Sequence, residues 1–117
     1  MEHLVLVPAT QEVFAGEPLS VPVTRLDGTV APQIKDLCIE AVAGRPLILG
    51  IDLSRVEFMD SGGLGALLAC RKHVTALGGS LGLIAPRPLI LRVIEATGFD
   101  KVMPIYASRA DFEASLT

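Results

Sequence analysis

The sequence predicts an α/β domain with a mostly parallel central β-sheet, an antiparallel edge strand and about four helices. Two almost continuous apolar runs, residues 47–53 and 81–85, are typical of strands that are buried on both faces of a sheet. Segments with helical periodicity alternate with these runs, which implies right-handed crossovers between parallel strands. The length of 117 residues fits one domain over residues 1–117, with a core at about 19–115.

Two strands are expected in the N-terminal part of the chain. Residues 4–7 form a short apolar run that Pro8 ends. Residues 19–26 alternate between apolar and polar side chains, as a strand with one exposed face does. Pro22 favours an edge position for this second strand, because proline has no N–H for the ladder of hydrogen bonds.

The first helix is expected from Val30, where the apolar period changes. Either Asp27 or Thr29 can cap it, and Gly44 ends it. The other elements then follow in order: strand 47–53, helix 61–77, strand 81–85, a helix from Pro88 to Gly98, strand 101–106, and a helix that begins at Ser108.

The composition limits the possible classes of function. Half of the residues are hydrophobic and the mean hydropathy is +0.53. No apolar run approaches the roughly 20 residues of a membrane-spanning helix, and the N-terminus lacks a basic signal-peptide region. The net charge of −3 and the scattered Lys and Arg residues argue against nucleic-acid binding. We therefore expect a cytoplasmic domain without membrane insertion.

The two cysteines are expected to be buried thiols. Cys38 and Cys70 both lie within apolar helical patterns, and neither belongs to a CxxC motif. This pattern argues against a disulfide or a metal site and suggests a reducing compartment. We expect no cofactor and no metal.

The most informative stretch is the loop between strand 47–53 and helix 61–77. It delivers Asp60 and Ser61 to the first turn of the helix, at the carboxyl end of the strands, where open α/β sheets place their sites. Unpaired N–H groups and the helix dipole favour an anion there. Two interpretations of Ser61 remain open: it is part of a simple N-cap, or it is an exposed hydroxyl that a partner modifies.

One side of helix 61–77 is nearly free of charge. Its core-facing side is expected to carry Leu64, Leu67, Cys70, Val74 and Leu77. The opposite side carries Gly62, Gly65, Ala66, Ala69, His73 and Ala76. Small residues allow another backbone to approach closely, so either a partner protein or a second helix of the same chain is expected to pack there.

An enzyme is the main competing class. The two histidines, His3 and His73, are poorly placed for a Ser-His-Asp arrangement with Ser61. Asp52 ends a buried strand as in a response-regulator receiver, but the first strand offers no acidic pair. We therefore assign no catalytic residue, although a nucleotide phosphate at the glycine-rich helix start remains an alternative.

The sequence resembles STAS domains, and the bacterial anti-sigma factor antagonists most closely. The motif Asp60-Ser61-Gly62-Gly63-Leu64-Gly65, preceded by the strand 47–53, carries the resemblance, which extends from about Val21 to Ser115. Stressosome components, lipid-transport accessory proteins and nucleotide-binding regulatory modules share this domain and stay open as alternatives.

The resemblance implies a non-enzymatic partner switch that regulates sigma-factor-dependent transcription. Unphosphorylated antagonist would bind an anti-sigma factor that is a serine kinase, phosphorylation of Ser61 would switch it off, and a PP2C-type phosphatase would restore it. The chain is expected to be a monomer or a weak dimer. The expected partner-binding residues are Asp27, Asp60, Ser61, Gly62, Gly63, Gly65, Ala66 and Ala69.

Overall fold

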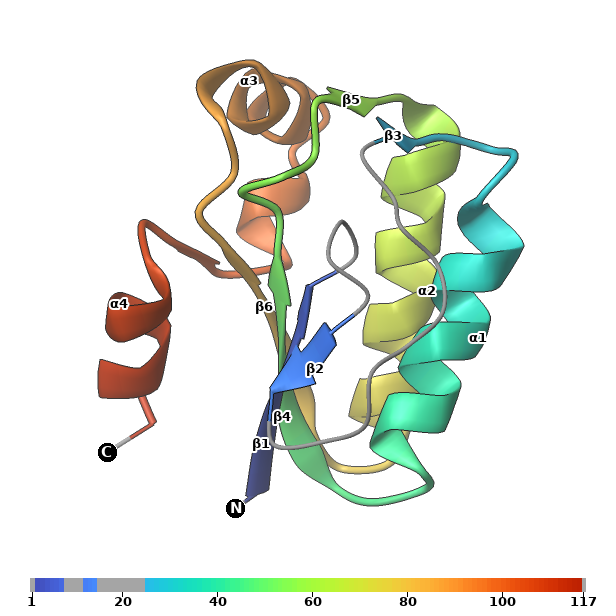
Figure 1. The fold of residues 1–117 in the computed structure, drawn as a ribbon, viewed down its shortest axis with the longest axis vertical. Helices are drawn as coiled ribbons and strands as arrows, with labels where there is room; N and C mark the ends of the chain where they lie inside the picture. Colours follow the sequence, from blue (N-terminus) through green and yellow to red (C-terminus); the bar gives the residue numbers. More distant parts are fainter. Residues whose placement is uncertain (1, 8–11, 15–24, 117) are drawn as a thin grey trace.

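A computed structural model describes residues 2–7, 12–14 and 25–116. Their main sheet has the order β2-β1-β4-β6-β7 (Figure 1). Within this sheet, the adjacent strands β1, β4, β6 and β7 run parallel to one another, and β2 runs antiparallel to β1 at one edge. The α/β class and the mostly parallel sheet are thus confirmed. The strands are β1 (Glu2–Val7), β2 (Glu12–Phe14), β4 (Leu47–Asp52), β6 (Ser80–Ile84) and β7 (Ile105–Tyr106).

A second, two-stranded sheet lies outside the main one. Its strands are β3 (Arg25–Leu26) and β5 (Phe58–Met59), which pair in parallel. Most of the strand expected at 19–26 lies outside the described residues. Its described end belongs to this small sheet and not to an edge of the main sheet, so the expected position is wrong for these two residues.

The helices cover both faces of the main sheet (Figure 1). α1 (Ala31–Val42) and α2 (Ser61–Ala76) lie side by side on one face, and α4 (Arg109–Ala114) lies on the other. α3 (Pro88–Ala96) contributes Ile90 and Ile94 to the same core as α1 and α2. The four expected helices are therefore present.

Two local expectations are wrong. α1 begins after Val30 without a side-chain cap, because the Asp27 carboxylate accepts hydrogen bonds from the N–H and hydroxyl of Thr29. The strand expected at 101–106 is shortened to β7, and a 3₁₀ turn, η1 (Phe99–Lys101), precedes it. The hydrogen bonds to Thr29 thus replace the expected cap of α1, and the 3₁₀ turn replaces the first part of the expected strand.

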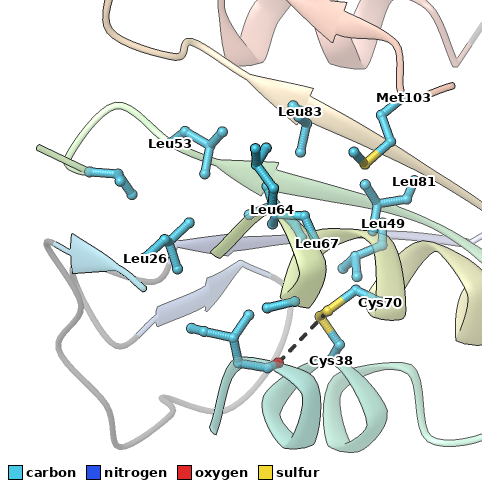
Figure 2. Packing of buried hydrophobic residues seen from close by; sticks show 14 of the residues in the cluster. Leu26, Cys38, Leu49, Leu53, Leu64, Leu67, Cys70, Leu81, Leu83 and Met103 are labelled. Carbon is cyan, nitrogen blue, oxygen red and sulfur yellow. Dashed lines mark hydrogen bonds between the residues drawn. A yellow bond between two sulfur atoms is a disulfide. The ribbon is translucent and has the colours of Figure 1, made fainter. Parts of the chain in front are cut away.

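Strand β4 shows how the core is divided. Leu47, Leu49 and Ile51 face the large cluster shared with α1, α2 and α3 (Figure 2). Gly50, on the other face, lies under the Phe112 ring of α4, and a Cβ at this position would approach the ring to 2.9 Å. The strand is therefore buried on both faces, as its apolar run predicts.

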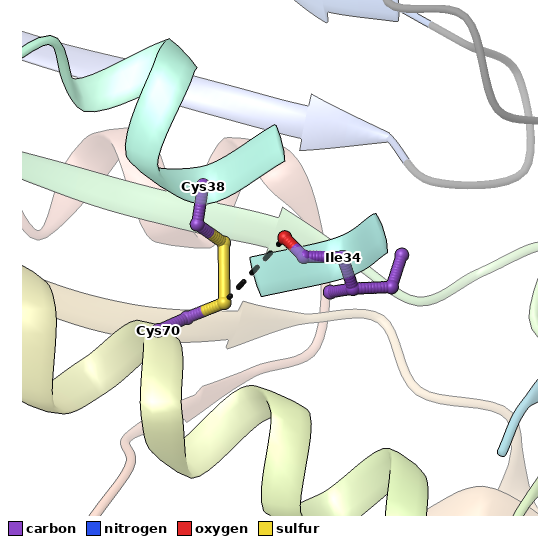
Figure 3. The surroundings of a disulfide bond; sticks show 3 residues. All are labelled: Ile34, Cys38 and Cys70. Atoms are coloured by element: carbon purple, nitrogen blue, oxygen red, sulfur yellow. Dashed lines mark hydrogen bonds between the residues drawn. A yellow bond between two sulfur atoms is a disulfide. The ribbon is translucent and has the colours of Figure 1, made fainter. Parts of the chain in front are cut away.

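The cysteines correct a further expectation. Cys38 of α1 and Cys70 of α2 form a disulfide, with their Cα atoms 5.9 Å apart (Figure 3). Both residues are buried as expected, but the expectation of two free thiols is wrong. The packing of α1 on α2 brings together two residues that are 32 positions apart, at a Cα separation typical of disulfides.

Candidate functional site

The small β3–β5 sheet positions the candidate site. Leu26 is the register partner of Met59, and the Leu26 carbonyl also accepts a hydrogen bond from the N–H of Asp60 at 3.2 Å. The Arg25 guanidinium lies 4.1 Å from the centre of the Phe58 ring, a cation–π contact across the same pair of strands. These contacts hold the loop that follows β3 beside the start of α2.

Asp60 caps α2 and leaves Ser61 exposed. One Asp60 carboxylate oxygen accepts hydrogen bonds from the N–H groups of Gly62 at 2.9 Å and Gly63 at 3.1 Å. Ser61 is the first residue of the helix, and its hydroxyl forms no hydrogen bond with another described residue. The capping function therefore belongs to Asp60, and Ser61 is exposed at the first position of the helix.

Two positions of the motif require glycine, because another part of the same chain packs closely against them. A Cβ on Gly62 would lie 2.5 Å from the main-chain nitrogen of Gly28, and a Cβ on Gly63 would overlap the Leu26 carbonyl. Gly63 is buried, so its side of α2 faces the core and not the surface. Gly65, by contrast, is exposed and has open space where a Cβ would lie.

A shallow groove of about 420 Å³ runs between the N-terminal halves of α1 and α2. Of the α2 residues that line the groove, Ala66 is buried, whereas Ala69 is only partly buried. Thus the N-terminal part of the small-residue side of α2 borders the groove, whereas His73 and Ala76 are not among the lining residues. The lining residues are Gly28, Ala31, Pro32 and Lys35 from the α1 side and Gly62, Gly65, Ala66 and Ala69 from α2.

Asp27 adds a negative charge at the end of this groove. Its main chain lies beside Gly62, since a Cβ on Gly62 would be 3.2 Å from the Asp27 carbonyl carbon. The hydrogen bond from the Thr29 hydroxyl, at 2.6 Å, holds the pKa of the Asp27 carboxyl below its usual value. Arg25 lies 3.7 Å away and acts in the same direction. Asp27 is therefore favoured in its ionised form, on the loop that lies beside Gly62.

The structure brings most of the expected site residues together. Asp27, Asp60, Ser61 and Gly62 gather at the start of α2, and Gly65, Ala66 and Ala69 continue along the groove. Gly63 is the exception, because it contacts Leu26 inside the fold. Sequence reasoning missed Lys35, although it lies one helical turn after Ala31, on the side of α1 that faces the groove.

The groups considered for catalysis lie elsewhere. The His3 ring lies edge-on to the ring of Phe112, which belongs to α4 on the opposite face of the sheet from α2 (Figure 1). Asp52 pairs with Arg109 at 3.1 Å and accepts the N–H of Ser54. Among the described residues, no three His, Cys, Asp or Glu side chains are grouped so that they could hold a metal ion.

The comparisons with known proteins agree with this geometry. The family model of the STAS domain matches residues 21–112. The chain belongs to the STAS domain family. The resemblance inferred from the motif that begins at Asp60 is thus confirmed, and the motif of this STAS domain forms the exposed start of α2.

Relatives of this STAS domain are named as anti-sigma factor antagonists. The anti-sigma F factor antagonist of Paenibacillus polymyxa is 36% identical over 56 residues, which cover 48% of this chain and 48% of that protein, or about half its length. The crystal structure of an anti-sigma factor antagonist from Mycobacterium paratuberculosis is 34% identical, with a TM-score of 0.70 over 80% of this chain and 79% of that chain.

A more distant likeness shows the fold alone. The Bacillus cell fate determinant SpoIIAA, solved in its phosphorylated form, is 24% identical, with a TM-score of 0.60 over 81% of this chain and 86% of that chain. Within the described residues of this STAS domain, no helix combines the length and the apolar character needed to cross a bilayer.

Proposed function

We propose that this STAS domain is an anti-sigma factor antagonist whose binding to its partner is controlled by phosphorylation of Ser61. The exposed Ser61 hydroxyl at the start of α2, beside the groove between α1 and α2, is the observation that carries this proposal. The names of its relatives support the antagonist function, and one protein of the same fold exists in a phosphorylated form.

In the unphosphorylated state, the chain binds an anti-sigma factor that is a serine kinase and thereby frees a sigma factor. The groove offers a surface of small residues such as Gly62 and Gly65, with Lys35 in its lining and the Asp27 main chain beside Gly62. Gly63 is not part of this surface, because it is buried. The protein acts in the cytoplasm as a binding module and not as an enzyme, as a monomer or a weak dimer.

Phosphorylation changes the charge of this surface without unfolding it. A phosphate on Ser61 adds about −1.5 to −2 charges directly after Asp60 and near the loop that carries Asp27. The positive end of the α2 dipole offsets part of this charge by roughly 0.3–1 kcal/mol. The helix therefore persists, while an acidic or apolar partner surface is repelled, and a PP2C-type phosphatase reverses the change.

Incubation with the cognate kinase and ATP, followed by mass spectrometry of peptides, tests the site of modification. We expect one phosphate, on Ser61. Ser108 is a matched internal control, because it also stands at a helix start but its hydroxyl accepts the Asp111 N–H. Phosphate on Ser108 with Ser61 untouched would contradict the proposal.

Binding measurements test the electrostatic switch separately. We expect Ser61→Ala to bind the kinase as tightly as the wild type, because it removes only the acceptor hydroxyl. Ser61→Asp should bind at least tenfold more weakly, since it adds a permanent charge beside Asp60. Equal affinities of the two variants would contradict the electrostatic switch. In a separate thermal-unfolding measurement, stabilisation by nucleotides without the kinase would favour a nucleotide-binding module instead.

A further inference from the structure

The disulfide joins α1 and α2 just after the residues of each helix that line the groove. Cys38 follows Lys35 by three residues in α1, and Cys70 directly follows Ala69 in α2. Both sulfurs belong to the large buried cluster, and their bond joins the facing sides of the two helices (Figure 3). The bond thus cross-links the two elements that carry the groove.

The same place also suits the reduced form of the pair. The Cys70 sulfur lies 3.9 Å from the main-chain oxygen of Ile34 (Figure 3). In the disulfide this sulfur carries no proton, but a Cys70 thiol can donate a weak hydrogen bond to that oxygen. A free cysteine otherwise behaves as a small apolar side chain, which fits the surrounding core. Both redox forms are therefore compatible with the fold.

We propose that Cys38 and Cys70 are a reversible redox couple that sets the rigidity of the α1–α2 pair. In the oxidising direction, the thiolate of one cysteine attacks a small disulfide such as oxidised glutathione and releases one small thiol. The second thiolate then attacks the mixed disulfide, closes the Cys38–Cys70 bond and releases a second small thiol. Two protein thiols are oxidised, one small disulfide is reduced, and the two cysteine protons pass to the released thiols.

Burial determines how this couple behaves. Because both sulfurs are fully buried, a small thiol or disulfide reaches them only when α1 and α2 separate transiently. Once formed, the bond closes a chain segment with a sequence separation of 32, which includes β4, β5 and the start of α2. Oxidation therefore restricts the helices around the groove, and this effect does not depend on whether Ser61 is phosphorylated.

The first test follows the two thiols directly. The full chain is equilibrated with glutathione buffers of increasing oxidised fraction, quenched in acid, alkylated after unfolding and weighed by mass spectrometry. We expect two species, one with two alkyl groups and one with none, that exchange reversibly as the buffer changes. Two alkyl groups at every ratio, or a stable glutathione adduct, would overturn the proposal.

The second test measures the effect on the fold. We expect the oxidised protein to melt on the order of 10 °C above the reduced protein, and its α1 and α2 amides to exchange hydrogen more slowly. Amides of α4 serve as an internal reference and should exchange equally in both forms. Cys70→Ala cannot form the Cys38–Cys70 bond, so its melting temperature should not rise as the oxidised fraction of the buffer increases. If this variant does not fold, the two wild-type forms still decide, since equal melting temperatures contradict the proposal.

Discussion

The two faces of the main sheet are built differently. On the face covered by α1 and α2, buried side chains from strands and helices form one large cluster that the disulfide cross-links. On the opposite face, the described residues form a smaller cluster of Val5, Ile84 and Phe112 with partly buried hydrophobic neighbours, and an ion pair joins Asp52 to Arg109 of α4. The candidate site belongs to the densely packed face. This difference indicates that α2 is anchored by a large cluster, whereas the buried side chain that α4 contributes is Phe112.

The largest expected effect tests how far α4 depends on one side chain. Phe112→Ala should cost about 3–5 kcal/mol, because the ring is fully buried and fills the space above Gly50 and Gly82. Denaturant unfolding measures the cost, and hydrogen exchange should show that α4 opens first. Phe112→Leu is the matched control and should cost less. A loss below about 1 kcal/mol for the alanine variant would mean that α4 is held by other contacts.

The next prediction concerns the densely packed face. Gly63→Ala should destabilise the protein by about 1–3 kcal/mol, because the new Cβ overlaps the Leu26 carbonyl of the small sheet. Gly65→Ala is a matched control in the same helix. It should stabilise by up to about 1 kcal/mol, since its Cβ meets open space and alanine favours the helix. Equal effects of both variants in thermal unfolding would contradict the close approach at Gly63.

A smaller effect is expected at the cap of α2. Asp60→Ala should cost about 1 kcal/mol, because the N–H groups of Gly62 and Gly63 lose their acceptor. Asp60→Asn keeps an acceptor oxygen and should lower the free energy of unfolding in urea by only a few tenths of a kcal/mol. If the two variants are equally unstable, the negative charge matters more than the hydrogen bonds.

The smallest effect is a pH dependence at Asp27. The pKa of its carboxyl is lowered in the folded state, so its contribution to stability is present above the ordinary aspartate pKa of 3.8 and is lost as the pH falls through the folded pKa. Asp27→Asn should therefore melt below the wild type at pH 7 and match it in strong acid. Thr29→Val, which removes the hydroxyl donor, should show the same trend. A difference that persists in strong acid would point to another cause.

Local signals in the sequence predicted much of the fold and the start of the site. The apolar runs predicted β4 and β6, because a strand that is buried on both faces needs few polar side chains. Asp60 and the glycines that follow it predicted the start of α2 and its cap, since a cap acts over two or three residues. These features depend only on neighbours in the chain.

Features that depend on distant contacts could not be predicted in this way. The disulfide requires the register of α1 on α2, which no local pattern of Cys38 or Cys70 contains. Gly62 and Gly63 were expected to contact a partner, but the β3–α1 loop packs against Gly62 and Leu26 of β3 packs against Gly63. The strands β3 and β5 have two residues each, too few to show a period.

The main-chain contacts around Leu26 have a consequence for redesign. The hydrogen bond from Asp60 to the Leu26 carbonyl, and the fit of Gly63 against it, fix the outline of the site without using the side chains that face solvent. We therefore expect exchanges at Lys35 and Gly65 to alter partner recognition by the proposed binding surface while the scaffold stays intact. Related chains that keep this scaffold could be kept from cross-reacting within one cell by changing those surface positions alone.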